Sequence, residues 1–380
     1  MKKRALMLAS VASMIDQFNI PNISLLQSLG YEVDVIADFV DGGSISSERI
    51  ISLKKRLSDM NVTVFHIAIP RSITRIGDLI ESYKRIRSTI VEREYSLIHC
   101  HSPIGGVLCR LAAKDVRKSG AKVLYTAHGF HFYKGAPLMN WLFFYPIEKI
   151  CSKYTDVLIT INKEDYNFAK KHMRSRLIEY VPGIGVDTKA FAFSKSIREK
   201  KRLEYGLKDD DIALLSVGEL NKNKNHETAL KAISQIEDRS RIHYFIVGKG
   251  DLNDYLSEMA ISLNVNLHLL GYQTCMHELY CMADIFLFPS FREGLPVSLM
   301  EAMASGLPCI VSKIRGNSDL IQDGKGGFLF DPKDDSCFSK ILKSLCRDNP
   351  RDIGSTNTEI VKKFDKSNVN DKMRIIYKSV

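Results

Sequence analysis

Short apolar runs alternate with longer segments in which apolar residues recur every three or four positions, and this pattern continues along the whole chain. The short runs predict buried strands, and the longer segments predict helices with one buried face. In the first half we expect strands at 5–9, 32–37, 62–69, 97–100, 122–126 and 157–161. Helices are expected between them, at 20–29, 47–57, 74–91, 104–117, 137–149 and 163–172. Such alternation is typical of α/β folds with parallel sheets.

The segment 181–187 contains a proline and two glycines and predicts a hinge, after which the alternation starts again. The second half predicts strands at 211–218, 242–247, 265–270, 283–288, 309–311 and 326–330, with helices between them. We therefore predict two doubly wound domains, 1–182 and 187–361, that meet at a central cleft, with ligands at the carboxyl ends of the strands. In the tail 362–380, four apolar residues at near-helical spacing predict a helix that packs back on the first domain: Val369, Met373, Ile376 and Tyr377.

The stretch 283–312 carries the strongest chemical signal. A strand leads into a loop that contains Glu293, and a helix then begins at Pro296, where a missing N–H costs nothing. The free N–H groups around Leu295, Val297 and Ser298 at such a helix start can hold a phosphate. Glu301, about a turn and a half into the helix, can accept two hydroxyls from a ribose, and Glu293 faces what is attached to the phosphate. The stretch therefore suits a nucleotide diphosphate that carries a sugar.

The pair Glu293-x7-Glu301 inside FREGLPVSLMEAMASGLP resembles the donor-binding signature of the retaining glycosyltransferases of family GT4. This resemblance implies the GT-B fold, with two Rossmann-like lobes and a last helix that crosses back to the first lobe. It also implies that Glu293 contacts the donor hexose and that Glu301 contacts the ribose. GT-B enzymes need no metal for their chemistry, and the sequence has no DxD motif, so we expect neither a metal nor another cofactor.

A glycine and a lysine after the first strand of the second domain add to the predicted donor site. Gly218 lets the backbone approach a phosphate, and the amine of Lys224 can neutralise it. The run 218–225 resembles the GT4 motif G-R-L-x-x-x-K-G, in which Lys224 falls on the lysine that contacts the diphosphate. Glu219 stands where arginine is common, and we expect Lys222 to replace part of that contact. Gly248 ends the next strand and suits the base-and-ribose side of the pocket.

In the first domain, polar residues follow the expected strand ends. His128, before Gly129, resembles the GT4 histidine that reaches the donor sugar, and we predict that it acts with Glu293 and Lys224. On the acceptor side we expect a loop at 10–17 and five residues: Ser13, Asp16, His101, Ser102 and His131. For His101 and Ser102, packing is the alternative role. Neither the histidines nor the eight cysteines have metal-ligand spacing, which favours reduced core thiols over a metal site.

Charge is unevenly distributed along the chain. The net charge of +10 divides into +9 for residues 1–182, −3 for 183–360 and +4 for 361–380. Basic clusters such as 54–56 and 84–87 lie on or beside predicted helices, near the aromatic segment 137–146, so an anionic membrane surface is the expected partner. The alternative is a solvated basic face with 141–145 in the core. No stretch approaches the run of about 20 apolar residues that a spanning helix needs, and no nucleic-acid recognition element is recognisable.

These observations predict an enzyme that transfers a hexose or N-acetylhexosamine from a nucleotide sugar, with a UDP-sugar as the expected donor, and retains the anomeric configuration. GT4 relatives that build bacterial surface polysaccharides, such as capsule and exopolysaccharide, imply a polyprenyl-diphosphate-linked acceptor and a peripheral site on the cytoplasmic face of the membrane. The alternatives are a nucleotide-sugar epimerase or hydrolase on the same fold, and a glycosyltransferase with a soluble acceptor.

Overall fold

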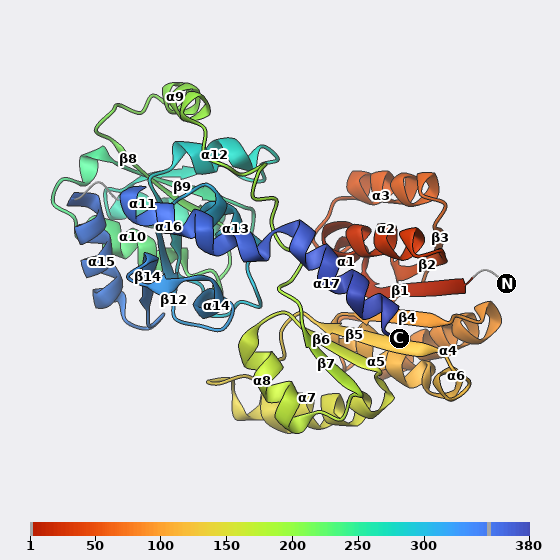
Figure 1. Cartoon of the computed structure of the whole chain (residues 1–380). Helices are drawn as coiled ribbons and strands as arrows, with labels where there is room; N and C mark the ends of the chain where they lie inside the picture. Colours follow the sequence, from red (N-terminus) through yellow and green to blue (C-terminus); the bar gives the residue numbers. More distant parts are fainter. Residues whose placement is uncertain (1–2, 348–350) are drawn as a thin grey trace. The chain divides into compact units, whose positions relative to one another are not determined.

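The computed structural model describes residues 3–347 and 351–380, which fold into two compact units. The first unit contains residues 1–184 and 369–380, and the second contains 185–368. Each unit is built around a seven-stranded sheet, and neighbouring strands pair in parallel (Figure 1). The predicted α/β fold with two parallel, doubly wound sheets is confirmed.

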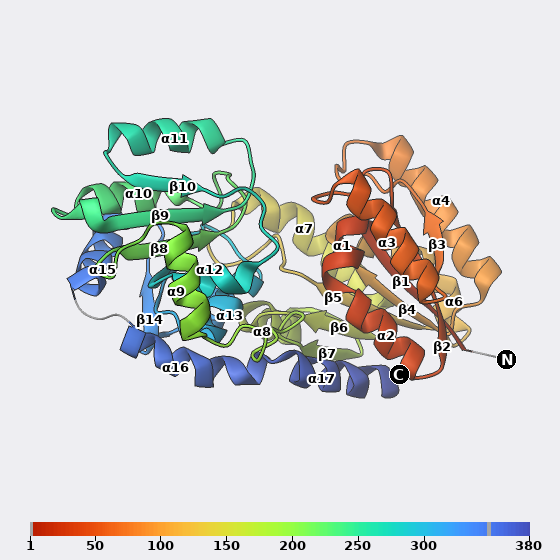
Figure 2. The same ribbon diagram turned by 90° about the horizontal axis from the view of Figure 1, so that it is seen from above.

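The first sheet has the strand order β3-β2-β1-β4-β5-β6-β7. Its strands are β1 (Lys3–Val11), β2 (Tyr31–Asp38), β3 (Thr63–His66), β4 (Leu97–His101), β5 (Lys122–Ala127), β6 (Val157–Thr160) and β7 (Leu177–Tyr180). Side chains of α1 (Ala12–Phe18), α2 (Ile20–Ser28), α3 (Ser47–Asp59) and α17 (Lys366–Lys378) form one apolar core with the sheet. The opposite core contains residues of α4 (Ile76–Arg93), α5 (Pro103–Ala112), α7 (Leu138–Cys151) and α8 (Lys163–His172). Figure 2 shows the same unit from above.

The second sheet has the order β10-β9-β8-β11-β12-β14-β13. Its strands are β8 (Ile212–Val217), β9 (Ile242–Val247), β10 (Asn266–Leu269), β11 (Ile285–Phe288), β12 (Cys309–Ser312), β13 (Gln322–Asp323) and β14 (Gly326–Phe330). One core holds residues of α10 (His226–Ser234), α11 (Asn253–Ser262) and α15 (Asp335–Arg347). On the other face α12 (Met276–Met282) packs through Tyr280 on Phe286, beside α9 (Lys195–Glu204) and α13 (Val297–Ala304). The helix α16 (Arg351–Val361) packs against α13.

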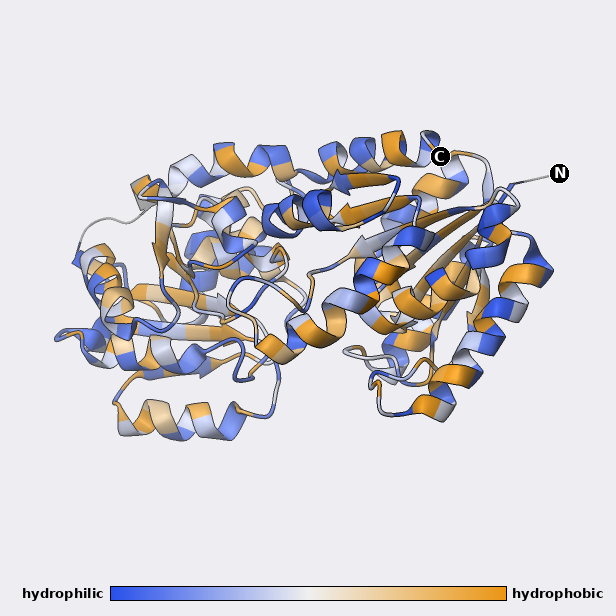
Figure 3. Cartoon of the chain, turned by 90° about the horizontal axis from the view of Figure 1, so that it is seen from below, coloured by the Kyte–Doolittle hydropathy of each residue, from blue (hydrophilic) through white to orange (hydrophobic). Residues whose placement is uncertain are grey.

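Hydropathy follows this layering. In Figure 3 the strands are largely hydrophobic, whereas many helices alternate between hydrophobic and hydrophilic residues along their length. The alternation is what a helix with one buried face requires. No helix in the described part of the chain is long and apolar enough to cross a lipid bilayer.

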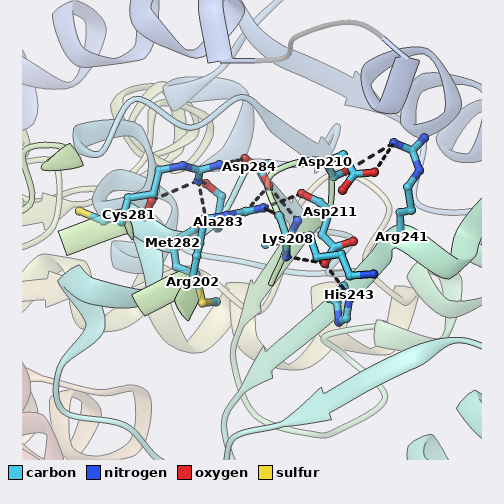
Figure 4. A network of polar contacts seen from close by, with 12 residues as sticks. Arg202, Lys208, Asp210, Asp211, Arg241, His243, Cys281, Met282, Ala283 and Asp284 are labelled. Atoms are coloured by element: carbon cyan, nitrogen blue, oxygen red, sulfur yellow. Dashed lines mark hydrogen bonds and ion pairs between the residues drawn. The ribbon is translucent and has the colours of Figure 1, made fainter. Parts of the chain in front are cut away.

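A polar network holds the amino-terminal ends of β8 and β11 in the second unit (Figure 4). Asp284 accepts hydrogen bonds from Arg198 at 2.6 Å and Arg202 at 3.1 Å, both on α9, and from the backbone N–H of Ala213 at 2.8 Å. Because the sheet is parallel, this network lies at the end of the strands opposite to their carboxyl ends. It fixes α9 to the sheet at the end opposite to the loops that follow the strands.

Several predicted elements differ from the structure. Residues 12–18 form helix α1, so the expectation of a loop over 10–17 is wrong. The helix expected at 104–117 is interrupted and forms α5 and α6 (Lys114–Lys118), and the strand expected at 62–69 is limited to β3. Neither β7 nor α9 was predicted, because β7 has four residues and α9 carries two apolar residues in ten.

The tail helix α17 begins in the second unit and continues into the first. Val369, Met373, Ile376 and Tyr377 are each at most 4% exposed and belong to the core of the first unit. Tyr377 also hydrogen-bonds to His99 of β4, at 2.8 Å. Residues 369–380 therefore belong to the first unit, where they share one apolar core with α1, α2 and α3.

Candidate active site

In the second unit, glycines bring the loops after β8 and β9 into backbone contact. A Cβ atom on Gly248, which has φ +151°, would lie 1.9 Å from the carbonyl oxygen of Gly218. The Gly218 N–H donates to Val247 at 2.9 Å, and the Leu220 N–H donates to Lys249 at 3.0 Å. The two loops thus extend the sheet beyond its strands, and only glycine fits at position 248.

The side chain of Lys224 lies across Gly218. A Cβ atom on that glycine would come within 2.9–3.2 Å of three carbons of the lysine. This course places Nζ 4.9 Å from the centroid of the Phe288 ring and 2.7 Å from Oε1 of Glu293. The lysine and glutamate side chains are only 19% and 12% exposed. The structure therefore brings together Lys224 and Glu293, two of the three residues predicted to act in catalysis.

Hydrogen bonds fix the loop that carries Glu293 to the loop that carries Lys224. Asn223 accepts from the Phe291 N–H at 2.8 Å through its backbone and donates to the Arg292 carbonyl at 3.0 Å through its side chain. Asn225 donates to the carbonyl of Pro289 at 3.2 Å. On the other side Arg315 donates to the backbone carbonyl of Glu293 at 3.2 Å. Sequence reasoning missed these asparagines and Arg315, because their partners are distant in the chain.

The helix α13 begins next to this loop. Pro296 is its N-cap, with φ −76° and ψ 121°, so the helix starts at Val297 and not at Pro296 as predicted. No side chain caps this end, and the first N–H groups of a helix have no acceptor within the helix. The predicted donor residues Leu295, Pro296 and Val297 are therefore contiguous at an uncapped helix start, where an anion is favoured.

Glu301, on α13, pairs with a residue that the sequence did not indicate. Tyr280 of α12 donates to Oε2 of Glu301 at 2.9 Å and lies 3.1 Å from the carbonyl of Ser298. Burial raises the pKa of Glu301 to about 7, and the Tyr280 hydrogen bond opposes this shift. Oε2 is thus held by the tyrosine, and the carboxyl group changes charge near neutral pH.

Two other residues of the loop that carries Lys224 do not take part in its ion pair with Glu293. Glu219, which stands at the usual arginine position, is exposed and accepts from Asn221 at 2.8 Å. Lys222 is exposed and lines a hollow of about 660 Å³ with Tyr255 and Phe291. That hollow does not include Lys224 or Glu293, so the structure does not bring Lys222 to the ion pair, and its phosphate contact stays a prediction.

Three histidines stand together at the carboxyl ends of β4 and β5 in the first unit. Nδ1 of His101 lies 3.1 Å from Nε2 of His128, and the ring centroids of His99 and His101 are 4.2 Å apart. His99 contacts Tyr377 and Thr126, each at 2.8 Å. Burial lowers the pKa of His99 to about 3 and of His128 to about 4, and it lowers the pKa of His101 well below its ordinary value. All three rings are therefore neutral at physiological pH.

The other predicted acceptor-side residues fall into two groups, one on α1 and one around a hollow. Ser13 is buried in α1, and Asp16 on the same helix accepts two hydrogen bonds from Arg49, at 2.8 and 3.0 Å. Ser102 and His131 line a hollow of about 480 Å³, together with Ser10, Arg71, Ile73 and Phe144. The structure thus brings Ser102 and His131 to one concave surface, whereas Asp16 is engaged by an arginine.

Within the described residues, no group of three or more His, Cys, Asp or Glu side chains is arranged to hold a metal ion. The charged groups that the structure does bring together are Lys224, Glu293 and the start of α13. A lysine amine and helix N–H groups suit a diphosphate, and carboxylates suit sugar hydroxyls. The arrangement can bind a nucleoside diphosphate linked to a sugar.

Comparison with protein families supports the same chemistry. Residues 23–189 match the family "Glycosyltransferase Family 4", and residues 197–362 match "Glycosyl transferases group 1". The chain is 34% identical to the putative glycosyltransferase EpsD of Bacillus subtilis, over 99% of this chain and 97% of that protein. It is 31% identical to a UDP-Gal:alpha-D-GlcNAc-diphosphoundecaprenol alpha-1,3-galactosyltransferase of Escherichia coli, over 84% of each chain.

Solved structures show the same fold at lower identity. The complex of Anabaena Alr3699/HepE with UDP-glucose has a TM-score of 0.79 at 18% identity, over 99% of this chain and all of that chain. WaaG, a glycosyltransferase involved in lipopolysaccharide biosynthesis, has a TM-score of 0.73 at 16% identity, over 98% and 99% of the two chains. Both likenesses extend over both units of the chain.

Proposed function

The chain belongs to the family 4 glycosyltransferases, which have the GT-B fold, and on this premise we propose the reaction that it catalyses. The enzyme transfers a hexose or N-acetylhexosamine from a UDP-sugar to a lipid-linked saccharide, with retention of the anomeric configuration and without a metal. The product belongs to surface polysaccharide synthesis. The observation that carries this proposal is the ion pair of Lys224 and Glu293 beside the uncapped start of α13.

This arrangement serves the departure of a diphosphate. When the bond between the anomeric carbon and the diphosphate oxygen breaks, negative charge develops on the leaving group and has to be stabilised. Lys224 and the N–H groups of Val297 and Ser298 supply positive charge at one place. The acceptor oxygen bonds to the anomeric carbon on the face that the diphosphate leaves, and the acceptor proton moves to the departing phosphate. Glu293 then orients donor hydroxyls and does not become covalently attached.

The nucleoside is held by a second carboxyl group. Glu301 keeps Oε1 for a ribose hydroxyl while Tyr280 occupies Oε2. The solved HepE complexes contain UDP and UDP-glucose, and the galactosyltransferase relative is named for UDP-Gal. These relatives support a UDP-sugar as the donor of this chain.

The first unit supports a lipid-linked acceptor. The hollow at Ser102 and His131 combines a cation, Arg71, with apolar side chains of Ile73 and Phe144. A diphosphate attached to a lipid offers the complementary pair of features, an anion next to a hydrocarbon chain. The galactosyltransferase relative is named for a diphosphoundecaprenol acceptor, which is a ligand of this kind.

The surface of the first unit supports attachment to an anionic membrane. Trp141, Phe144 and Tyr145 of α7 pack on the core. Between them Leu142 is 62% exposed and Phe143 48%, and Leu138 and Met139 are also exposed. The unit carries a net charge of +11, counted over residues 1–184 and 369–380, against −1 for residues 185–368. Exposed apolar residues on a basic unit are the features by which peripheral proteins bind anionic leaflets.

Product analysis tests the proposed reaction. The protein is incubated with a UDP-hexose or UDP-N-acetylhexosamine, with and without a polyprenyl-diphosphate-linked sugar, and the products are separated and their anomeric linkage is assigned by NMR. We expect one added sugar with the donor's α configuration. An epimerised nucleotide sugar or a free sugar as the main product, with acceptor present, would identify an epimerase or hydrolase instead. Transfer to a water-soluble sugar alone would contradict the lipid-linked acceptor.

A further inference from the structure

His101 and His128 share one hydrogen bond, although they lie 27 residues apart. His101 is 1% exposed, its Nδ1 lies 3.1 Å from Nε2 of His128, and its own Nε2 is buried with no partner among the described residues. His128 is only partly buried, and no hydrogen bond that involves its Nδ1 is seen in the described part of the chain. Since two neutral imidazoles share this contact, one nitrogen carries the proton and the other accepts it.

The two possible arrangements differ in what they leave buried. If His128 donates from Nε2, the proton of His101 has to be on its own Nε2, and a buried N–H then lacks an acceptor. If His101 donates from Nδ1, its Nε2 carries no proton, and only an acceptor lone pair stays without a partner. Buried N–H groups without an acceptor are rarer in proteins than acceptors without a donor. The second arrangement is therefore favoured, and it leaves the proton of His128 on Nδ1.

We propose that His101 is a positioning residue, which holds His128 as a neutral imidazole with its proton on Nδ1. His128 then donates a hydrogen bond to a sugar hydroxyl oxygen. It cannot take a proton from the acceptor, because its one lone pair already accepts from His101. This inference rests on the proposed glycosyl transfer, and it agrees with transfer of the acceptor proton to the departing phosphate, because it excludes His128 as the base.

The surroundings keep the pair in this state. His99 is fixed by Tyr377 of the tail helix and by Thr126, and its ring stands 4.2 Å from that of His101. Phe18 meets the ring of His128 edge-on at 5.4 Å. Among the described residues, the titratable group seen against the pair is His99, which in turn contacts Tyr377. Burial holds the pKa of each imidazole below its ordinary value. Neither a carboxylate nor an added cation is needed to keep His128 neutral.

The tautomer can be observed directly in protein labelled with ¹⁵N-histidine, because protonated and bare ring nitrogens have different ¹⁵N shifts in a long-range correlation spectrum. His128→Gln identifies the signals of this residue. We expect the proton of His128 on Nδ1 across the range from about pH 6 to 8, because burial lowers the pKa of this imidazole to about 4. A proton on Nε2, or an imidazolium in this range, would overturn the proposal. The spectrum needs no substrate, so the result stands even if glycosyl transfer fails to appear.

Two variants at position 101 separate positioning from packing. Asn keeps an N–H donor at the δ position of the side chain, whereas Leu fills the space without a donor. We expect His101→Asn to preserve the tautomer and the transfer rate, and His101→Leu to release the tautomer and to slow transfer by on the order of tenfold, since small losses of alignment cost rate. UDP affinity should be unchanged in both. Equal rates in the two variants at equal melting temperature would contradict the proposal.

The same variants identify which sugar His128 contacts. If it binds the donor sugar, His101→Leu also slows hydrolysis of the UDP-sugar without acceptor. If it binds the acceptor sugar, the Leu variant raises the acceptor KM and leaves that hydrolysis unchanged. Loss of the Nδ1 proton signal in the Leu variant with neither kinetic change would mean that His128 contacts no sugar, and the proposed role would be wrong.

Discussion

The two units share the order of their first five strands and differ in the last two, and they use this arrangement for different purposes. In each sheet the first strand of the unit stands third from one edge, with the fourth strand beside it. The strand β8 ends at Gly218, whose backbone touches the next loop. The strand β1 ends near Ser10, whose hydroxyl accepts from the Gly105 N–H at 3.0 Å and contacts Ser102 at 2.9 Å. At the carboxyl ends of the strands, the second unit thus brings backbones into close contact, whereas the first unit uses hydrogen bonds between side chains and to the backbone.

The difference shows what topology leaves undecided. A parallel sheet places the loops at one edge, but residue type decides which ligand they suit. In the second unit, glycines, Lys224 and the start of α13 favour a phosphate. In the first unit, neutral histidines and serines suit hydroxyls, and we propose a lipid as the partner of the basic and apolar surface.

The first unit should depend on the tail helix for its stability. Met373→Ala removes a buried side chain from the core that includes β1 and α2, and a buried Met→Ala change costs roughly 2–5 kcal/mol. Ile375→Ala, on the same helix but 68% exposed, is the matched control and should change stability by less than about 0.5 kcal/mol. Denaturant unfolding measures both. Equal losses in the two variants would mean that the helix does not pack in this register.

The second unit should depend on Lys224 for turnover. Lys224→Ala removes a preorganised charge at the leaving group and should cost about 2–4 kcal/mol of transition-state stabilisation. Lys222→Ala, in the same loop but exposed and outside the ion pair with Glu293, is the control and should cost less. Steady-state rates with saturating donor decide between them. If Lys222 proves the more damaging, the loop contacts the diphosphate in another way.

The buried carboxyl group of Glu301 should make stability depend on pH. Its pKa is about 7 in the folded protein and 4.5 as an ordinary glutamate, so between these values the folded state holds a proton that the unfolded chain has lost. The stability contributed by the protonated form is therefore lost as pH rises through about 7. From about pH 5 to about pH 8, the melting temperature should fall more for the wild type than for Glu301→Gln. A wild-type advantage that grows with pH would contradict the assigned shift.

Membrane binding should follow the first unit. Leu142→Ser with Phe143→Ser should reduce sedimentation with vesicles that contain anionic lipid, and binding should weaken at high salt because each basic residue contributes roughly 1 kcal/mol. The control pair is Leu203→Ser with Ile261→Ser, two exposed residues of the second unit. Binding that ignores lipid charge and salt, or no binding at all, would leave a soluble acceptor equally well supported.

The periodicity of the sequence predicted most strands and helices, because buried strands and amphipathic helices leave patterns within a short window. It gave no helix at α1, where a loop was expected at 10–17. That helix has no side-chain cap and is held by packing on β1 and β2, which no local pattern reports.

The candidate site was predictable where its residues are close in sequence. Glu293, Glu301 and the helix start lie within ten residues of one another, and the pair inside the stretch FREGLPVSLMEAMASGLP indicated a nucleotide sugar. The partners of these residues were not predictable. Tyr280 reaches Glu301 from another helix, and Lys224 meets Glu293 across 69 positions. Contacts of this kind depend on strand order, which periodicity does not determine.

We propose that the loops at the carboxyl ends of the second sheet bind the nucleotide through Glu301 and carry out transfer through Glu293. Calorimetric titration of Glu293→Ala and Glu301→Ala with UDP, alongside transfer rates, tests it most directly. Glu301→Ala should lose UDP affinity, because it loses the ribose contact. Glu293→Ala should bind UDP nearly as the wild type does and lose turnover. Unchanged activity in either folded variant, or loss of UDP affinity in the Glu293 variant alone, would contradict the account.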